Sequence, residues 1–128
     1  MPSVLVIEDN IENLELAVCL LKIKGYKIEV AMDGEKALEL ADRYNFNLIL
    51  LDIWLPKIDG FEVLRKLKNT LNSNTPVVIV TACILNGDEE QFLASRCAYY
   101  LEKPFTMNKF HEVISIYISD SNLVDGQI

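Results

Sequence analysis

Five polar side chains of this sequence each stand where an apolar run stops: Glu8, Asp9, Asp52, Thr81 and Lys103. Three carboxylates brought within ~5 Å of one another would repel by about 3 kcal/mol per pair at an effective dielectric constant of about 20. Such a cluster raises the pKa of one acid or captures a cation. Oxygen ligands without histidine or cysteine select a hard cation. The pattern therefore predicts an acidic, cation-binding site with a hydroxyl group and an ammonium group beside it.

The apolar runs before these residues are typical of strands that are buried on both faces of a parallel sheet. They occupy 4–7, 47–51, 76–80 and, more weakly, 99–102. In open parallel sheets, chemistry gathers at the carboxyl ends of the strands, so all five side chains are expected along one edge. Each residue alone has a commoner, structural explanation. Asp52 could cap a helix, Thr81 could be chosen for its strand propensity, and Lys103 could be a solvated surface lysine. Their joint placement favours a functional site.

The remaining segments supply the elements that must position this edge. A partly exposed edge strand is expected at 27–32, and apolar residues at three- and four-residue steps predict helices in 14–21, 37–41, 61–67 and 110–117. One more helix, the fourth in chain order, is expected between the last two strands. It should start at Asn86 and contain few apolar residues. Strand and helix thus alternate five times, which predicts an α/β fold: a doubly wound, five-stranded parallel sheet with five helices, in a flavodoxin-like three-layer sandwich.

Four short motifs give the sequence a family resemblance: Glu8-Asp9, Asp52 with Pro56 and Gly60 after it, Thr81-Ala82, and Lys103-Pro104. With them, 4–118 resembles the receiver domains of two-component response regulators, which include the chemotaxis receiver and the receivers of single-domain phosphorelay proteins and hybrid kinases. The resemblance implies the strand order 2-1-3-4-5 of the chemotaxis receiver. It also implies that Asp52 accepts a phosphoryl group from a histidine. A carboxylate is ionised at neutral pH and needs no general base for this role.

The resemblance also implies a metal site. Asp9 and Asp52 would ligate Mg²⁺ (or Mn²⁺) directly, Glu8 would act through water, and the backbone carbonyl of Trp54 would be a further ligand. The indole of Trp54 is expected over the mouth of the site.

Four further residues receive roles from the resemblance. Lys103 and the hydroxyl group of Thr81 would contact the phosphoryl oxygens, which suits a reaction that depends on positioning and charge. A cis peptide bond before Pro104 would aim the lysine. Tyr100 would be the switch aromatic, turning inward when Thr81 moves toward the phosphoryl group.

Length and composition limit the other possibilities. The 128 residues suit one domain, which we expect to span 1–119, with a polar tail at 120–128. A net charge of −7 without a basic stripe argues against direct binding of nucleic acid. Three scattered cysteines, no apolar stretch of membrane-spanning length and no signal peptide predict a cytoplasmic protein. The single histidine, His111, is interpreted as a surface residue.

We therefore expect a signalling receiver rather than an enzyme, which promotes its own phosphorylation and slow dephosphorylation. Its expected partners are a sensor histidine kinase or a histidine phosphotransfer protein, and a downstream protein on the face of the fourth helix, fifth strand and fifth helix. The resemblance also allows a homodimer.

Other interpretations remain open. The chain could be a receiver excised from a larger hybrid kinase or regulator, or a pseudo-receiver that binds partners without phosphorylation. A phosphoaspartate phosphatase or phosphotransferase would need a second acid where Trp54 stands. A nucleotide-binding flavodoxin-like protein would need a glycine-rich first loop instead of Glu-Asp-Asn.

Overall fold

The computed structural model describes residues 2–55, 58–81 and 97–118. Its strands are β1 (Ser3–Ile7), β2 (Lys27–Ala31), β3 (Leu48–Asp52), β4 (Val77–Thr81) and β5 (Tyr99–Glu102). Its helices are α1 (Ile11–Ile23), α2 (Gly34–Arg43), α3 (Gly60–Leu67) and α5 (Met107–Tyr117). Every strand begins and ends within one residue of its predicted range. The helix predicted from Asn86 lies outside the described residues. None of the described helices is both long enough and apolar enough to cross a membrane.

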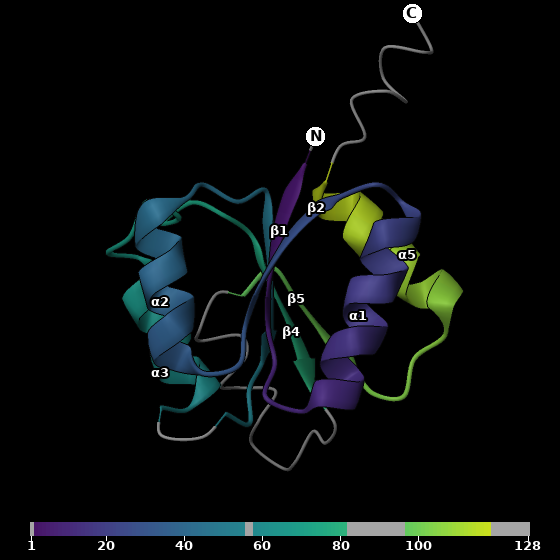
Figure 1. Ribbon diagram of the computed structural model, residues 1–128, viewed down its shortest axis with the longest axis horizontal. Helices are drawn as coiled ribbons and strands as arrows, with labels where there is room; N and C mark the ends of the chain where they lie inside the picture. The colour runs from purple at the N-terminus through teal and green to yellow at the C-terminus, as the bar shows by residue number, and fades with distance from the viewer. Residues whose placement is uncertain (1, 56–57, 82–96, 119–128) are drawn as a thin grey trace, which may run out of the picture.

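All five strands run parallel, in the order β2-β1-β3-β4-β5. Within this order, Ile7 of β1 pairs with Ala31 on one side and with Leu51 on the other. Helices α2 and α3 cover one face of the sheet, and α1 and α5 cover the other (Figure 1). The doubly wound sandwich and the predicted strand order are confirmed. The carboxyl ends of β1, β3 and β4 consequently meet at one edge.

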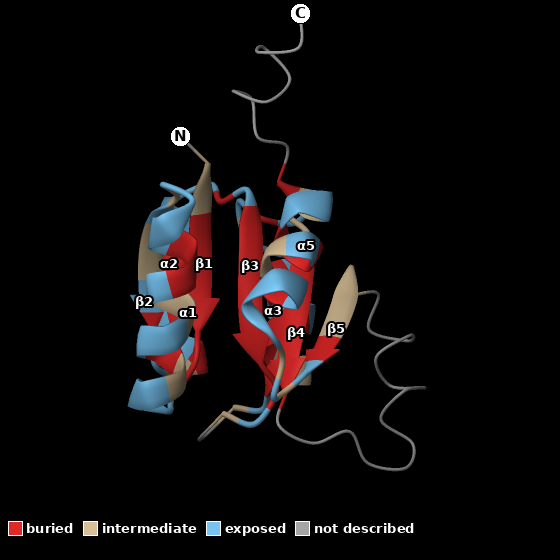
Figure 2. Ribbon diagram, turned by 90° about the vertical axis from the view of Figure 1, so that its right-hand side faces the viewer, coloured by how far each residue is buried: buried red, intermediate tan, exposed pale blue. Residues whose placement is uncertain are grey.

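The three central strands are buried almost completely (Figure 2). Because neighbouring residues of a strand point to opposite faces, each strand contributes to two cores. Leu5, Ile49 and Ile79 belong to the core under α2 and α3. Leu50 and Val80 belong to the core under α1 and α5. The continuous apolar runs of the sequence are therefore explained by helices on both faces of the sheet.

Each described helix begins with a capping side chain. The side-chain oxygens of Asn10, Asp33, Asp59 and Thr106 accept hydrogen bonds from the backbone N–H groups three residues further on. These bonds satisfy donors that the first turn of a helix leaves without a partner. Two of the caps, Asn10 and Asp59, fix where the loops after β1 and β3 end. The first of these loops carries Glu8 and Asp9, and the second follows Asp52, the last residue of β3.

His111 is not the surface residue that we expected. It is partly buried, and its Nε2 donates a hydrogen bond to the carbonyl group of Leu20, at 3.0 Å. The interpretation was wrong because the apolar pattern of the last helix does not show how closely α1 packs against it. His111 ties α5 to α1.

Candidate functional site

Three carboxylates gather where β1 and β3 end. Glu8 and Asp9 follow β1, and Asp52 is the last residue of β3. One oxygen atom of each lies within 4.8 Å of the others. Glu8 and Asp52 are 5% and 8% exposed, whereas Asp9 is open to solvent. Among the described residues, no histidine or cysteine belongs to this cluster, so its donors suit a hard cation such as Mg²⁺.

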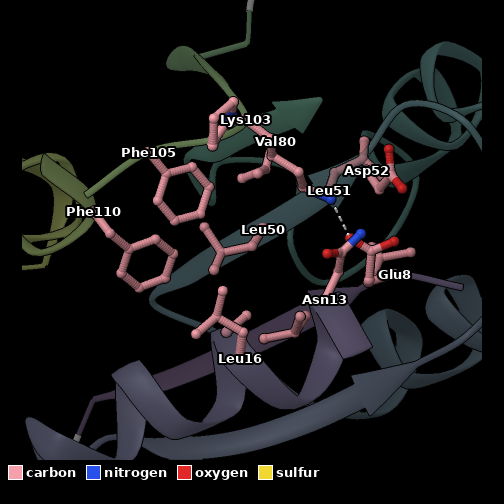
Figure 3. A pocket seen from close by; sticks show the side chains of 14 residues that line it. Glu8, Asn13, Leu16, Leu50, Leu51, Asp52, Val80, Lys103, Phe105 and Phe110 are labelled. Carbon is pink, nitrogen blue, oxygen red and sulfur yellow. Dashed lines mark hydrogen bonds and ion pairs between the residues drawn. The ribbon is translucent and has the colours of Figure 1, made fainter. Parts of the chain in front are cut away.

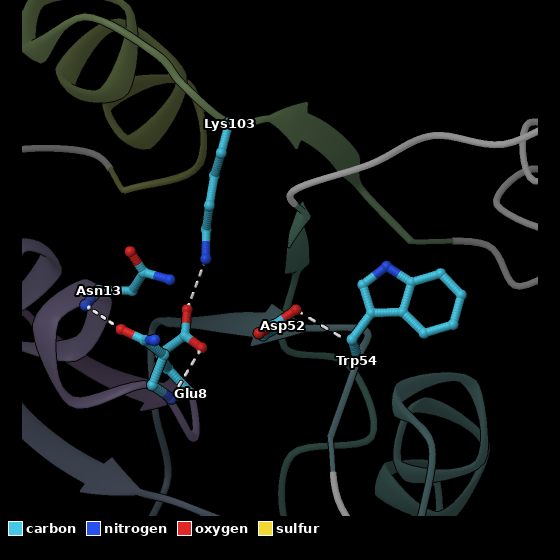
Figure 4. A network of polar contacts seen from close by, with 6 residues as sticks. Glu8, Asn13, Asp52, Trp54 and Lys103 are labelled. Atoms are coloured by element: carbon cyan, nitrogen blue, oxygen red, sulfur yellow. Dashed lines mark hydrogen bonds and ion pairs between the residues drawn. The ribbon is translucent and has the colours of Figure 1, made fainter.

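Lys103 brings an ammonium group to these acids from the far edge of the sheet. It follows β5, and its Nζ lies 2.6 Å from Oε1 of Glu8, with both side chains largely buried. The side chain thus extends past the ends of β4 and β3 to reach the end of β1 (Figure 4). A charge-assisted contact this short holds the ammonium group next to the carboxylates.

The backbone before Lys103 is anchored to the neighbouring strand. The N–H group of Lys103 donates to the carbonyl group of Thr81 at 2.7 Å, and the Lys103–Pro104 peptide bond is cis. Thr81 ends β4 and is fully buried. The structure therefore brings Thr81 and Lys103 to the edge where the three acids lie.

Asp52 holds its proton unusually tightly. Its pKa is raised from 3.8 to about 7, chiefly because burial disfavours the charged form, and further because of a hydrogen bond and charge repulsion with Glu8. The backbone N–H of Trp54, 3.1 Å from Oδ1 of Asp52, and the charge of Lys103 act in the opposite direction. A cation at the cluster would favour the ionised carboxylate.

The loop after Asp52 returns to the end of β3. The N–H group of Gly60 donates to the carbonyl group of Ile53 at 2.9 Å. A Cβ atom at Gly60 would lie 2.6 Å from Cα of Ile53, so no larger residue fits without moving the backbone. Trp54 is 52% exposed, and its indole lies on the opposite side of Asp52 from Glu8 and Lys103 (Figure 4). The indole therefore flanks Asp52 instead of covering the ion pair.

Sequence reasoning missed the contribution of Asn10 to this site. Its backbone N–H donates to Oε2 of Glu8 at 3.3 Å, while its side chain caps α1 through the N–H group of Asn13 at 3.0 Å. Glu8 is consequently held from two sides, by Lys103 and by the start of α1. An asparagine between a predicted strand and a segment whose apolar residues have helical spacing is a capping signal. The sequence therefore did indicate that Asn10 caps the helix.

Tyr100 lies on β5, partly buried, and packs against the core under α2 and α3. Its role as a switch, and that of the Trp54 carbonyl as a ligand, stay predictions. Pro56 and Ala82 lie outside the described residues.

Comparisons with known proteins agree with this geometry. The family model described as "Response regulator receiver domain" matches residues 4–115. The polar-differentiation response regulator DivK of Brucella ovis is 38% identical over 120 residues, which are 93% of this chain and 98% of that protein. DivK proteins of other Brucella species match to the same extent.

Solved structures of receivers share the fold. The receiver domain of a sensor histidine kinase from Pseudomonas aeruginosa, with a magnesium ion in its active-site cleft, is 30% identical with a TM-score of 0.83, over 91% of this chain and 96% of that one. The chemotaxis protein CheY4 of Vibrio cholerae is 25% identical with a TM-score of 0.86, over 92% and 99% of the two chains. The family match covers most of the chain, including Glu8, Asp52, Thr81 and Lys103. The chain therefore belongs to the family of response regulator receiver domains.

Proposed function

We propose that Asp52 is the residue of this receiver that accepts the phosphoryl group. The observation that carries the proposal is the clustering of three carboxylate oxygens within 4.8 Å, with the ammonium group of Lys103 2.6 Å from one of the acids. Among these acids, Asp52 ends a central strand, and its Oδ1 is fixed by the N–H of Trp54. Oδ2 of Asp52 is therefore the oxygen that we assign as the nucleophile.

The transfer is a simple substitution at phosphorus. Oδ2 of Asp52 forms a bond to the phosphorus atom while the bond from phosphorus to the donor's imidazole nitrogen breaks. The imidazole leaves with the electron pair and takes up a proton from solvent. The reaction asks mainly for alignment and for positive charge around the phosphoryl oxygens.

Glu8, Asp9 and Asp52, together with the backbone carbonyl of Trp54, would hold Mg²⁺ (or Mn²⁺), with Glu8 acting through water. The bound cation would lower the repulsion between the nucleophile and the phosphoryl oxygens. Lys103 would offer its ammonium group to one of these oxygens, and Thr81 its hydroxyl group to another. The ion pair with Glu8 already holds Nζ of Lys103 at the site, so little reorganisation is needed.

The output is a change of binding surface. Tyr100 and Thr81 would act as the switch, and the face that includes β5 and α5 would bind a downstream protein. The phosphoryl group would come from a sensor histidine kinase or a histidine phosphotransfer protein, in the cytoplasm, and no separate substrate would be turned over. A homodimer, and the division into a receiver at 1–119 and a tail at 120–128, stay predictions.

The test is an intact-mass measurement. The protein is incubated with Mg²⁺ and a small phosphodonor such as acetyl phosphate, and the same is done for Asp52→Asn and for wild type with a chelator. We expect one added phosphoryl group in wild type with Mg²⁺ and none in the other two samples. Equal phosphorylation of wild type and Asp52→Asn would overturn the assignment.

A further inference from the structure

A cavity of about 190 Å³ opens beside the carboxylates, on the face of the sheet that α1 and α5 cover. Asn13, Leu16 and Ala17 line it from α1, and Phe105 and Phe110 line it from the segment after β5. Leu16 is 53% exposed, so the wall that α1 forms reaches the surface.

The two ends of this cavity differ in chemistry (Figure 3). At one end lie Phe105 and Phe110, whose rings stack with centroids 5.3 Å apart, and Leu50 lies between them and the acids. The described side chains at this end, Leu50, Phe105 and Phe110, offer only carbon surface. An aromatic ring fits such a space, because a cavity of about 150 Å³ lined by leucine, isoleucine and phenylalanine takes up benzene.

At the other end lie Glu8 and Asp52 (Figure 3). When ionised, these carboxylates carry two negative charges, and Lys103 is the only cation among the described residues that line the cavity. Nζ of Lys103 is already engaged by Oε1 of Glu8. The polar end therefore favours a cation over an anion, and an ammonium group can donate hydrogen bonds to the carboxylate oxygens.

We propose that this cavity binds small aromatic amines, with the ring against Leu50, Phe105 and Phe110 and the ammonium group at Glu8 and Asp52. The volume left beyond a single ring admits a short arm, so benzylamine represents the class. The inference does not depend on phosphoryl transfer, although it uses two of the acids assigned to the metal site.

The first test compares ligands on the wild-type chain without Mg²⁺ or phosphodonor. Benzylamine, benzyl alcohol, benzoate and methylamine are titrated while the backbone amide signals of Asn13, Leu50 and Phe105 are followed by NMR. Burial of a ring should make benzylamine bind at least about tenfold more tightly than methylamine. Its charge should place it ahead of benzyl alcohol, with benzoate weakest. Saturable shifts in this order support the proposal.

Three results would overturn the proposal: no saturable shift at millimolar benzylamine, equal affinity for methylamine, or equal affinity for benzyl alcohol. Equal affinity for methylamine would mean that the acids bind any small cation. Equal affinity for benzyl alcohol would mean that the positive charge of the amine does not contribute to binding.

A second test closes the cavity. Ala17→Leu adds three carbon atoms to the wall, whereas Cys19→Leu adds similar bulk to an exposed position of the same helix. We expect Ala17→Leu to weaken benzylamine binding about tenfold or more and Cys19→Leu to leave it unchanged. Equal binding by both variants places the amine elsewhere and contradicts the proposal. If Ala17→Leu fails to fold, the ligand series on wild type still decides the matter.

Phosphorylation is measured separately by intact mass. A chain that is phosphorylated but does not bind benzylamine refutes this inference alone. A chain that binds benzylamine but is not phosphorylated refutes the proposed function alone.

Discussion

At the scale of single residues, the stability of the chain is linked to the proton on Asp52. The pKa of this carboxyl group is raised from 3.8 to about 7 in the folded protein. The folded state therefore binds this proton more tightly than the unfolded state does. The resulting stabilisation is present in full below a pH of about 4 and is lost as the pH rises through about 7. Above that pH, the buried carboxylate destabilises the metal-free protein.

Asp52→Asn removes the buried negative charge, and the asparagine side chain has nearly the same shape. We predict that the variant is more stable than wild type by roughly 2 to 4 kcal/mol above about pH 7 with a chelator present, and similar to wild type near pH 4. Urea unfolding at several pH values measures the difference. Asp42→Asn, at an exposed position of α2, is the control and should change stability little. A variant no more stable than wild type at high pH would contradict the raised pKa.

Trp54 belongs to the same scale. Its indole flanks Asp52 and is half exposed, so it stands where water could approach an acyl phosphate. Hydrolysis needs a water molecule held in line, and an indole cannot orient one as an amide can. We predict that Trp54→Asn loses its phosphoryl group several-fold faster than wild type, and that Trp54→Phe, which keeps an aromatic ring, does not. Dephosphorylation rates of the three proteins, followed by intact mass, decide this. If the asparagine variant is no faster, the shielding role of Trp54 is wrong.

At the scale of elements, a buried asparagine joins the segments that precede β3 and β4. Asn72 is 2% exposed, and its Nδ2 donates to the carbonyl groups of Ala41 and Tyr44 at 2.7 and 2.8 Å. Its Oδ1 accepts from the N–H group of Phe46 at 2.8 Å and from the hydroxyl group of Thr75 at 2.9 Å. All four hydrogen bonds lie at the end of the sheet opposite to the acids, and they hold the start of the central strands.

We predict that Asn72→Ala destabilises the chain by about 2 to 4 kcal/mol, because several buried backbone groups lose their partners. Asn74→Ala, an exposed position in the same loop, should have little effect. Urea unfolding measures both, and magnesium-dependent phosphorylation of the folded protein should stay near the wild-type level. Equal stability of the two variants would mean that the Asn72 network does not hold this loop.

At the scale of the whole molecule, the apolar runs sufficed to predict a parallel sheet and the edge where the acids meet, whereas the strand order came from the resemblance to receiver domains. Unbroken apolar runs identify strands that are buried on both faces, and a parallel arrangement necessarily brings their carboxyl ends together. The residues after those runs were therefore predictable as neighbours.

The contacts between the site residues could not be predicted from the sequence. The pairing of Lys103 with Glu8 depends on how far a lysine from the edge strand extends over its neighbours, and the pKa of Asp52 depends on its burial. Neither follows from spacing along the chain. The burial of Asn72 was not predictable either, because a single asparagine carries no sequence signal for burial.

Among the three neighbouring acids, Asp52 is the one that we expect to receive the phosphoryl group. Borohydride reduces an acyl phosphate to an alcohol and leaves free carboxylates intact, so peptide mapping by mass spectrometry after reduction identifies the modified residue. We predict that reduction of the phosphorylated chain converts position 52 to homoserine and leaves Glu8 and Asp9 unchanged. A reduced residue at position 8 or 9, with an intact Asp52, would contradict the account.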